Sequence, residues 1–177
     1  MMPTEFLIGC FAKGLVIRIA GRGTMQESLA FRAAVEHSPA AAVVVFDAMQ
    51  CDYVDSTFLG CLIWMKKACE GSPKRQFVIA ASKATRIKLF STTTLGGYFD
   101  FVDDCPEPVE KFVTIDVEEF TSEELGRHVM RCHALLADTG GDKASAFKAV
   151  ADRLAKELGE TAFMPASESP NRPQRHF

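Results

Sequence analysis

Three adjacent polar residues, Asp55, Ser56 and Thr57, are the strongest candidates for chemistry in this chain. They follow an apolar, β-branched run at residues 42–46 and stand where an apolar helical pattern begins. Open α/β sheets place functional residues on loops that leave the carboxyl ends of strands. The unpaired amides and the dipole of a helix N-terminus favour anionic groups, so a phosphate on Ser56 would be stabilised there. The same residue types are also the preferred N-caps of helices, so capping alone is the alternative.

Two further pairs of residues could do chemistry. His128 and Cys132 stand four residues apart on a helical pattern and could be two metal ligands. No third ligand follows with recognisable spacing, so the sequence favours a packed helix face and predicts no metal site. Cys51 and Cys61 flank the Asp55 segment and would be redox sensors if their thiolates were stabilised, although buried, inert thiols are the more common case.

The motifs of common enzyme classes are missing from the sequence. Neither G-x-G-x-x-G nor G-x-x-x-x-G-K-[ST] occurs, and no serine lies in a G-x-S-x-G elbow. No nucleophile, base and orienting group can be recognised together. We therefore expect that the chain is not an enzyme and that it needs no cofactor.

Composition narrows the class of protein. The chain has 177 residues, of which 47% are hydrophobic and 24% charged, as in an ordinary globular protein. A net charge of −3 offers no basic patch for nucleic acid. No apolar run approaches the ~18 residues that cross a bilayer, and no signal peptide is recognisable. Six scattered cysteines without C-x-x-C indicate reduced thiols. We expect a soluble, cytoplasmic protein with no membrane insertion.

Residues 4–113 alternate strand-like and helical patterns. The pattern predicts a hairpin at 5–11 and 15–20, further strands at 42–46, 77–80 and 98–102, and helices at 25–37, 56–70 and 82–90. Thr24 and Glu27 have the spacing of a capping box. This order of elements predicts an α/β fold with a mixed β-sheet and helices packed on it.

Residues 117–159 predict a C-terminal helical hairpin. Thr121 and Glu124 form a second capping box, and Gly140 and Gly141 interrupt the helical pattern before Asp142, which we expect to cap the next helix. Both helices are amphipathic, so each must bury one face. That face meets the first domain, the other helix or a second copy of the protein, which would then be a homodimer. Residues 160–177 contain three prolines and predict a flexible tail.

The segment Asp-Ser-Thr-Phe-Leu-Gly at residues 55–60, after an apolar strand that ends in Asp47, resembles the signature of the STAS domain. That signature, Asp-Ser-(Ser or Thr)-Gly-Leu-Gly, follows a buried strand in bacterial anti-sigma-factor antagonists. Residues 21–24, the strand at 77–80 and residues 89–96 also match landmarks of the family. The resemblance covers about residues 4–113 and ends before the helical hairpin.

The resemblance implies a regulator of transcription that works by partner switching. Its partners would be a serine kinase that is also an anti-sigma factor, and a cognate phosphatase. Ser56 would be the phosphorylation site, with Thr57 as the alternative acceptor. The partner-binding residues implied by the family motif are Asp55, Ser56, Thr57, Phe58, Leu59 and Gly60.

Phe58 is the one departure from the family signature, which has glycine there. Either the kinase has a pocket for Phe58, or the site has lost phosphorylation and binds its partner constitutively. A core position for the Phe58 ring is about as common as an exposed contact. A second function that the resemblance allows is that of a cytosolic STAS subunit that regulates a membrane transporter.

Overall fold

The protein is described by a computed structural model that covers residues 4–38, 41–91, 93–106, 111–117 and 119–160. Within these residues, one mixed sheet contains β1 (Glu5–Phe11), β2 (Gly14–Gly23), β3 (Val43–Asp47), β4 (Cys51–Val54), β5 (Gln76–Ala80), β6 (Phe101–Val102) and β7 (Val113–Thr114). The strand order is β6-β5-β3-β2-β1-β7, and β4 pairs with the end of β2.

The directions of the strands confirm the predicted mixed α/β class. β1 pairs antiparallel with β2 and with β7, whereas the pairs β2–β3, β3–β5 and β5–β6 are parallel. A short hairpin turn permits antiparallel pairing, and a helical crossover is what joins parallel neighbours. The sheet is therefore antiparallel at its N-terminal hairpin and parallel from β2 to β6.

The helices are α1 (Met25–Glu36), α2 (Ser56–Glu70), α3 (Lys83–Phe90), the 3-10 helix η1 (Thr94–Gly97), α4 (Ser122–Asp138) and α5 (Ala144–Glu157). Both predicted capping boxes form, because the backbone N–H groups of Thr24 and Thr121 each donate to the glutamate three residues later, at 2.9 Å. The expected cap of α5 is wrong: Lys143, not Asp142, precedes the helix. Gly140 and Gly141 have φ values of 75° and 90°, so the chain is still turning at Asp142.

Three short elements were not predicted from the sequence. β4, β7 and η1 have four, two and four residues, too few to show a periodicity of their own. The strand expected at residues 98–102 is reduced to β6, because residues 98–100 form a turn and only Phe101 and Val102 pair with β5. β7 forms by pairing with the longer strand β1, and β4 forms by pairing with β2.

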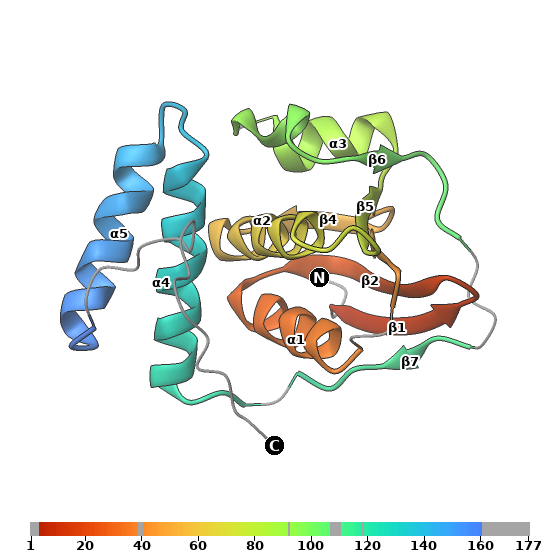
Figure 1. Cartoon of the computed structure of the whole chain (residues 1–177), viewed down its shortest axis with the longest axis horizontal. Helices are drawn as coiled ribbons and strands as arrows, with labels where there is room; N and C mark the ends of the chain where they lie inside the picture. The colour runs from red at the N-terminus through yellow and green to blue at the C-terminus, as the bar shows by residue number, and fades with distance from the viewer. Residues whose placement is uncertain (1–3, 39–40, 92, 107–110, 118, 161–177) are drawn as a thin grey trace, which may run out of the picture.

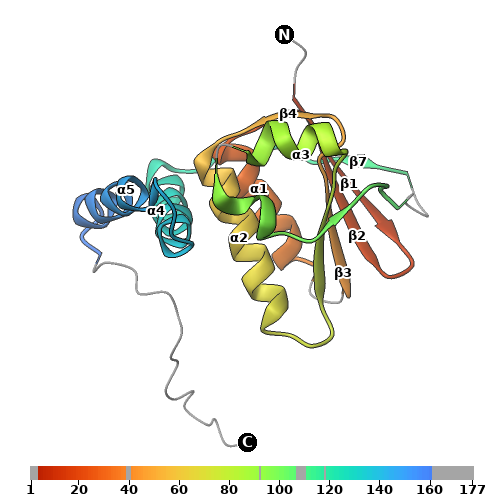
Figure 2. The ribbon, with the colours of Figure 1, turned by 90° about the horizontal axis from the view of Figure 1, so that it is seen from above.

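The elements lie in three layers. Figure 2 shows the sheet on one side, α1 and α2 packed on one of its faces, and the α4–α5 pair beyond α1 and α2. Figure 1 shows α4 beside the end of α2, with α5 on the outer side of α4. On the opposite face of the sheet, Val16, Val45 and Val78 form a smaller apolar cluster with Phe112. Helix α2 is thus enclosed between the sheet and α4.

Helix α4 shares the main core of the protein. Its residues Cys132, Leu135 and Leu136 belong to the same buried cluster as the inward side chains of the sheet, α1 and α2. The division into a domain at 4–113 and a hairpin at 117–159 stays a prediction, as does a homodimer through these helices. The predicted tail lies outside the described residues from 161 onward. Among the described helices, none is both long and apolar enough to cross a membrane.

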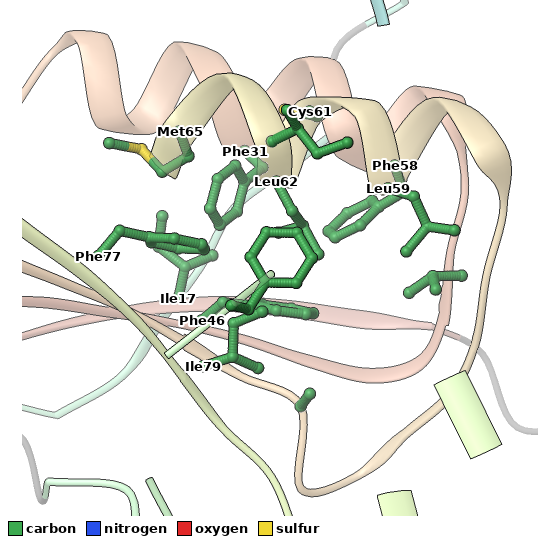
Figure 3. Close-up of a cluster of buried hydrophobic side chains, with 14 of the residues drawn as sticks. Ile17, Phe31, Phe46, Phe58, Leu59, Cys61, Leu62, Met65, Phe77 and Ile79 are labelled. Atoms are coloured by element: carbon green, nitrogen blue, oxygen red, sulfur yellow. The ribbon is translucent and has the colours of Figure 1, made fainter. Parts of the chain in front are cut away.

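Phe58 lies in the core and not on a partner-binding surface. Its ring is 0% exposed and packs 5.9 Å from the ring of Phe31 and 5.3 Å from that of Phe46, measured between centroids. Figure 3 shows it pointing from α2 toward the sheet, among the core side chains. A Cβ atom at Gly23 would lie 3.1 Å from the ring, so the small residue at position 23 makes room for the large one at position 58. The expectation that Phe58 contacts a partner is therefore corrected.

We predict that Phe58→Ala lowers the free energy of unfolding by about 3–5 kcal/mol, because it leaves a cavity among packed rings. Urea denaturation followed by circular dichroism measures this change. Ile87→Ala is the control, since Ile87 is 57% exposed and its truncation should cost less than about 0.5 kcal/mol. Similar losses in the two variants would contradict the assignment of Phe58 to the core.

Candidate functional site at the start of helix α2

Asp55 joins the starts of two helices. Its backbone N–H donates to the Gly23 carbonyl at 3.0 Å, which continues the pairing of β4 with β2. Its carboxylate accepts from the Phe58 N–H as the N-cap of α2 and from the Met25 N–H at the start of α1, both at 2.8 Å. Burial raises the pKa of the Asp55 carboxyl, and these hydrogen bonds oppose that rise. One side chain therefore sets the position of both helix N-termini.

The hydroxyl of Ser56 contacts a histidine of α4. Ser56 Oγ lies 3.0 Å from His133 Nε2, and His133 Nδ1 lies 2.9 Å from the Val129 carbonyl oxygen. A carbonyl oxygen only accepts, so Nδ1 of His133 carries a proton and donates to it. The Ser56 hydroxyl is therefore hydrogen-bonded to the opposite ring nitrogen, Nε2. The His133 ring also packs against Phe147 of α5, at 5.8 Å between centroids.

A second serine–histidine pair lies deeper, between α1 and α4. Ser28 Oγ lies 2.7 Å from His128 Nε2 and 2.8 Å from the Met25 carbonyl oxygen. Because that carbonyl only accepts, the Ser28 hydroxyl donates to it, and Ser28 Oγ accepts a hydrogen bond from His128 Nε2–H. Burial and the nearby Arg32 and Arg131 lower the pKa of His128 to about 4. His128 is therefore neutral in the folded protein near neutral pH.

At Gly60 the backbones of α2 and α4 come close together. A Cβ atom at this position would lie 2.3 Å from the carbonyl oxygen and 2.6 Å from the Cβ atom of Cys132. Only glycine lets the two helix backbones meet here. Gly60, the last residue of the motif at 55–60, therefore allows α4 to pack closely against α2.

The structure brings all the predicted site residues together but leaves few of them accessible. Asp55 and Ser56 are half-buried, whereas Thr57, Leu59 and Gly60 are buried, with Thr57 only 4% exposed. Most of the predicted partner-binding residues are inaccessible, because Phe58 and Leu59 belong to the core and α4 packs against Gly60. Sequence reasoning missed His133. No local signal could have found it, since 77 residues separate it from Ser56.

Ser56, His133 and the Val129 carbonyl are connected in the order in which a nucleophile, a base and an orienting group would be, an arrangement that no motif predicted. This geometry alone does not make a hydrolase, because acyl transfer also needs free N–H donors for a developing oxyanion. The amides of Phe58 and Met25, beside Ser56, already donate to the Asp55 carboxylate. These two amides are therefore not free to stabilise an oxyanion.

The alternative sites of the sequence analysis have little chemical support. Cys132 Sγ lies 3.6 Å from His128 Nε2, but no group of three metal-ligating side chains occurs in the described part of the chain. Burial raises the pKa of Cys51 to about 11 and that of Cys61 well above its usual value. A redox-sensing thiol needs the opposite shift.

We predict that Asp55→Ala lowers the free energy of unfolding by about 1–2 kcal/mol, because two helix N-terminal amides lose their acceptor. Asp142→Ala is the matched control, since Asp142 is exposed in the turn before α5 and caps no helix. Urea denaturation compares the two. A loss in Asp142→Ala as large as that in Asp55→Ala would contradict both assignments.

We predict that the protein loses stability as the pH falls from 6.5 toward 4. His128 faces Ser28 and Arg32 of α1 and Arg131 and Cys132 of α4, and its folded pKa of about 4 lies below the ordinary histidine pKa of about 6.5. The unfolded chain therefore binds a proton that the folded chain excludes, and stability is full only above pH 6.5. At pH 5 the expected loss relative to pH 7.5 is about 2 kcal/mol.

The test compares denaturation of the wild type and His128→Gln at the two pH values. Glutamine retains a hydrogen-bonding side chain but does not titrate. The difference between pH 7.5 and pH 5 should shrink in this variant by about 2 kcal/mol. An unchanged pH dependence would show that another group is responsible.

Comparison with known proteins adds one structural similarity. No family model matches the chain, and no curated protein is significantly similar to it. Among solved structures, the crystal structure of an anti-sigma factor antagonist from Mycobacterium paratuberculosis is similar, with 17% sequence identity and a TM-score of 0.44. The match covers 58% of this chain and 87% of that chain. A similarity of this degree assigns no function to the chain.

Proposed function

We propose that the protein is a phosphorylation-controlled interaction module of the anti-sigma-factor-antagonist kind, with Ser56 as the phosphoacceptor. The observation that carries the proposal is the position of the Ser56 hydroxyl. It is half-buried at the first residue of α2, directly after the strand and N-cap that position it. Thr57 is 4% exposed, which favours Ser56 over its neighbour as the acceptor.

The partners follow from the resemblance of the Asp55–Gly60 segment to the STAS signature. A serine kinase that is also an anti-sigma factor would transfer a phosphoryl group to Ser56, and a phosphatase would remove it. The phosphate adds a charge of about −1.5 to −2 next to the Asp55 carboxylate. Like charges at one helix start change the surface that a partner meets without refolding the sheet.

The burial of Phe58 removes one objection to this function. In the family signature a glycine at this position leaves space beside the acceptor, whereas here the ring turns into the core, toward Phe46. The side chain therefore does not stand between Ser56 and a kinase. Loss of phosphorylation through steric blocking by Phe58 has no support in this geometry.

We predict that a fraction of the protein from its native cells carries one phosphoryl group, and that the group is on Ser56. Peptide mass spectrometry with fragmentation across residues 55–58 locates it, because Ser56 and Thr57 are adjacent. The modification should disappear in Ser56→Ala and persist in Thr57→Val, which keeps the size of the buried side chain. Absence of phosphate at both Ser56 and Thr57 in several growth conditions would contradict control by phosphorylation. The protein would then be interpreted as a constitutive binding module.

A further inference from the structure

A pocket of about 150 Å³ lies where α1, α2 and α4 meet. One residue of α1, one of α2 and four of α4 line it: Arg32, Trp64, His128, Arg131, Cys132 and Leu135. The pocket is open to solvent, so a ligand can reach it without any movement of the helices. Ser56 is not among the lining residues, so this pocket is distinct from the candidate phosphorylation site.

Two guanidinium groups line this pocket from different helices. Arg32 of α1 donates through Nε to Glu36 at 2.8 Å and lies 4.8 Å from the centre of the Trp64 ring. Arg131 of α4, in contrast, has no carboxylate partner among the residues that the structure describes. Both positive charges lower the pKa of His128, which lines the same pocket and stays neutral. The six lining side chains thus carry two positive charges and no negative charge.

The rest of the pocket wall is uncharged and mainly apolar. Trp64 is half-buried, and Leu135 and Cys132 are buried. Burial raises the pKa of the Cys132 thiol to about 12, so the thiol carries no charge near neutral pH. Small-molecule sites combine such walls with a few polar groups that fix the orientation of the ligand. Because a planar guanidinium binds carboxylate and phosphate through paired hydrogen bonds, the wall suits an apolar ring with one acidic group.

We propose that this pocket binds a small aromatic acid, whose carboxylate or phosphate is held by Arg32 and Arg131 and whose ring lies against Trp64. The adjacent groove of about 230 Å³ fits an anion less well, because Glu36 and Glu124 also line it. A ligand held by three helices at once binds the folded protein and not the unfolded chain, so it raises stability. The proposal does not depend on the proposed function.

Tryptophan fluorescence measures binding without a label, because Trp64 is the only tryptophan of the chain. The full-length protein is titrated at constant ionic strength with benzoate, with phenyl phosphate and with benzamide as the neutral counterpart. We expect a saturable change with at least one of the two acids, with a Kd of about 1 mM for a ligand of this size. The Kd of benzamide should be at least about tenfold higher, because it lacks the charge that the arginines bind. The acid that binds more tightly distinguishes a carboxylate from a phosphate ligand.

Three arginine variants test which charges hold the ligand. Arg131→Gln removes one guanidinium from the pocket and should raise the Kd about tenfold. Arg127→Gln is the matched control on the same helix, because Arg127 lines the adjacent groove but not this pocket, and its Kd should change less than about twofold. Arg153→Gln is the control for net charge, since the Arg153 side chain on α5 is 81% exposed. Equal increases in all three variants would show attraction by overall charge and would overturn the proposal.

The melting temperature gives a second measurement that does not require a change in Trp64 fluorescence. The acid that binds should raise the melting temperature of the wild type in proportion to its occupancy, and the rise should be smaller for Arg131→Gln at the same concentration. Circular dichroism of each variant without ligand confirms that it is folded. A wild type that shows neither a fluorescence change nor a higher melting temperature with either acid would overturn the proposal, as would equal effects of benzamide and the acids.

Discussion

The rest of the structure depends on the enclosure of helix α2. Nine of its 15 residues are buried. A helix that is apolar on most of its circumference must be covered on more than one side. The sheet covers the side of Phe58 and Leu62, and α4 covers the side of Gly60. The C-terminal helices are therefore part of what keeps α2 away from water.

The candidate site is a consequence of this enclosure. Asp55 ties the starts of α1 and α2 to the end of β2, so the first turn of α2 has a defined position at one edge of the sheet. α4 then crosses α2 near that turn, because Gly60 is where the backbones can meet. His133 stands one residue after Cys132, which brings its ring to the Ser56 hydroxyl. Ser56 and His133 meet because of how α2 and α4 pack.

Polar groups in the α4 contact have a thermodynamic meaning. The side chains of Ser28, Ser56, His128 and His133 all have hydrogen-bond partners there, so their burial costs little in desolvation. The same contact also contains Cys132, Leu135 and Leu136, which belong to the main apolar core. Apolar packing and hydrogen bonds together hold α4 against α1 and α2.

The sequence by itself determined the local elements: the hairpin, the mixed α/β order, the start of α2 at Ser56 and the capping boxes at Thr24 and Thr121. These depend on side chains a few residues apart, so periodicity and capping patterns contain the information. Only the tertiary structure decided that Phe58 faces the core, that the turn delays α5 past Asp142, and that His133 contacts Ser56. These outcomes depend on which helix faces meet across distant parts of the chain, and no local pattern of residue types encodes that pairing.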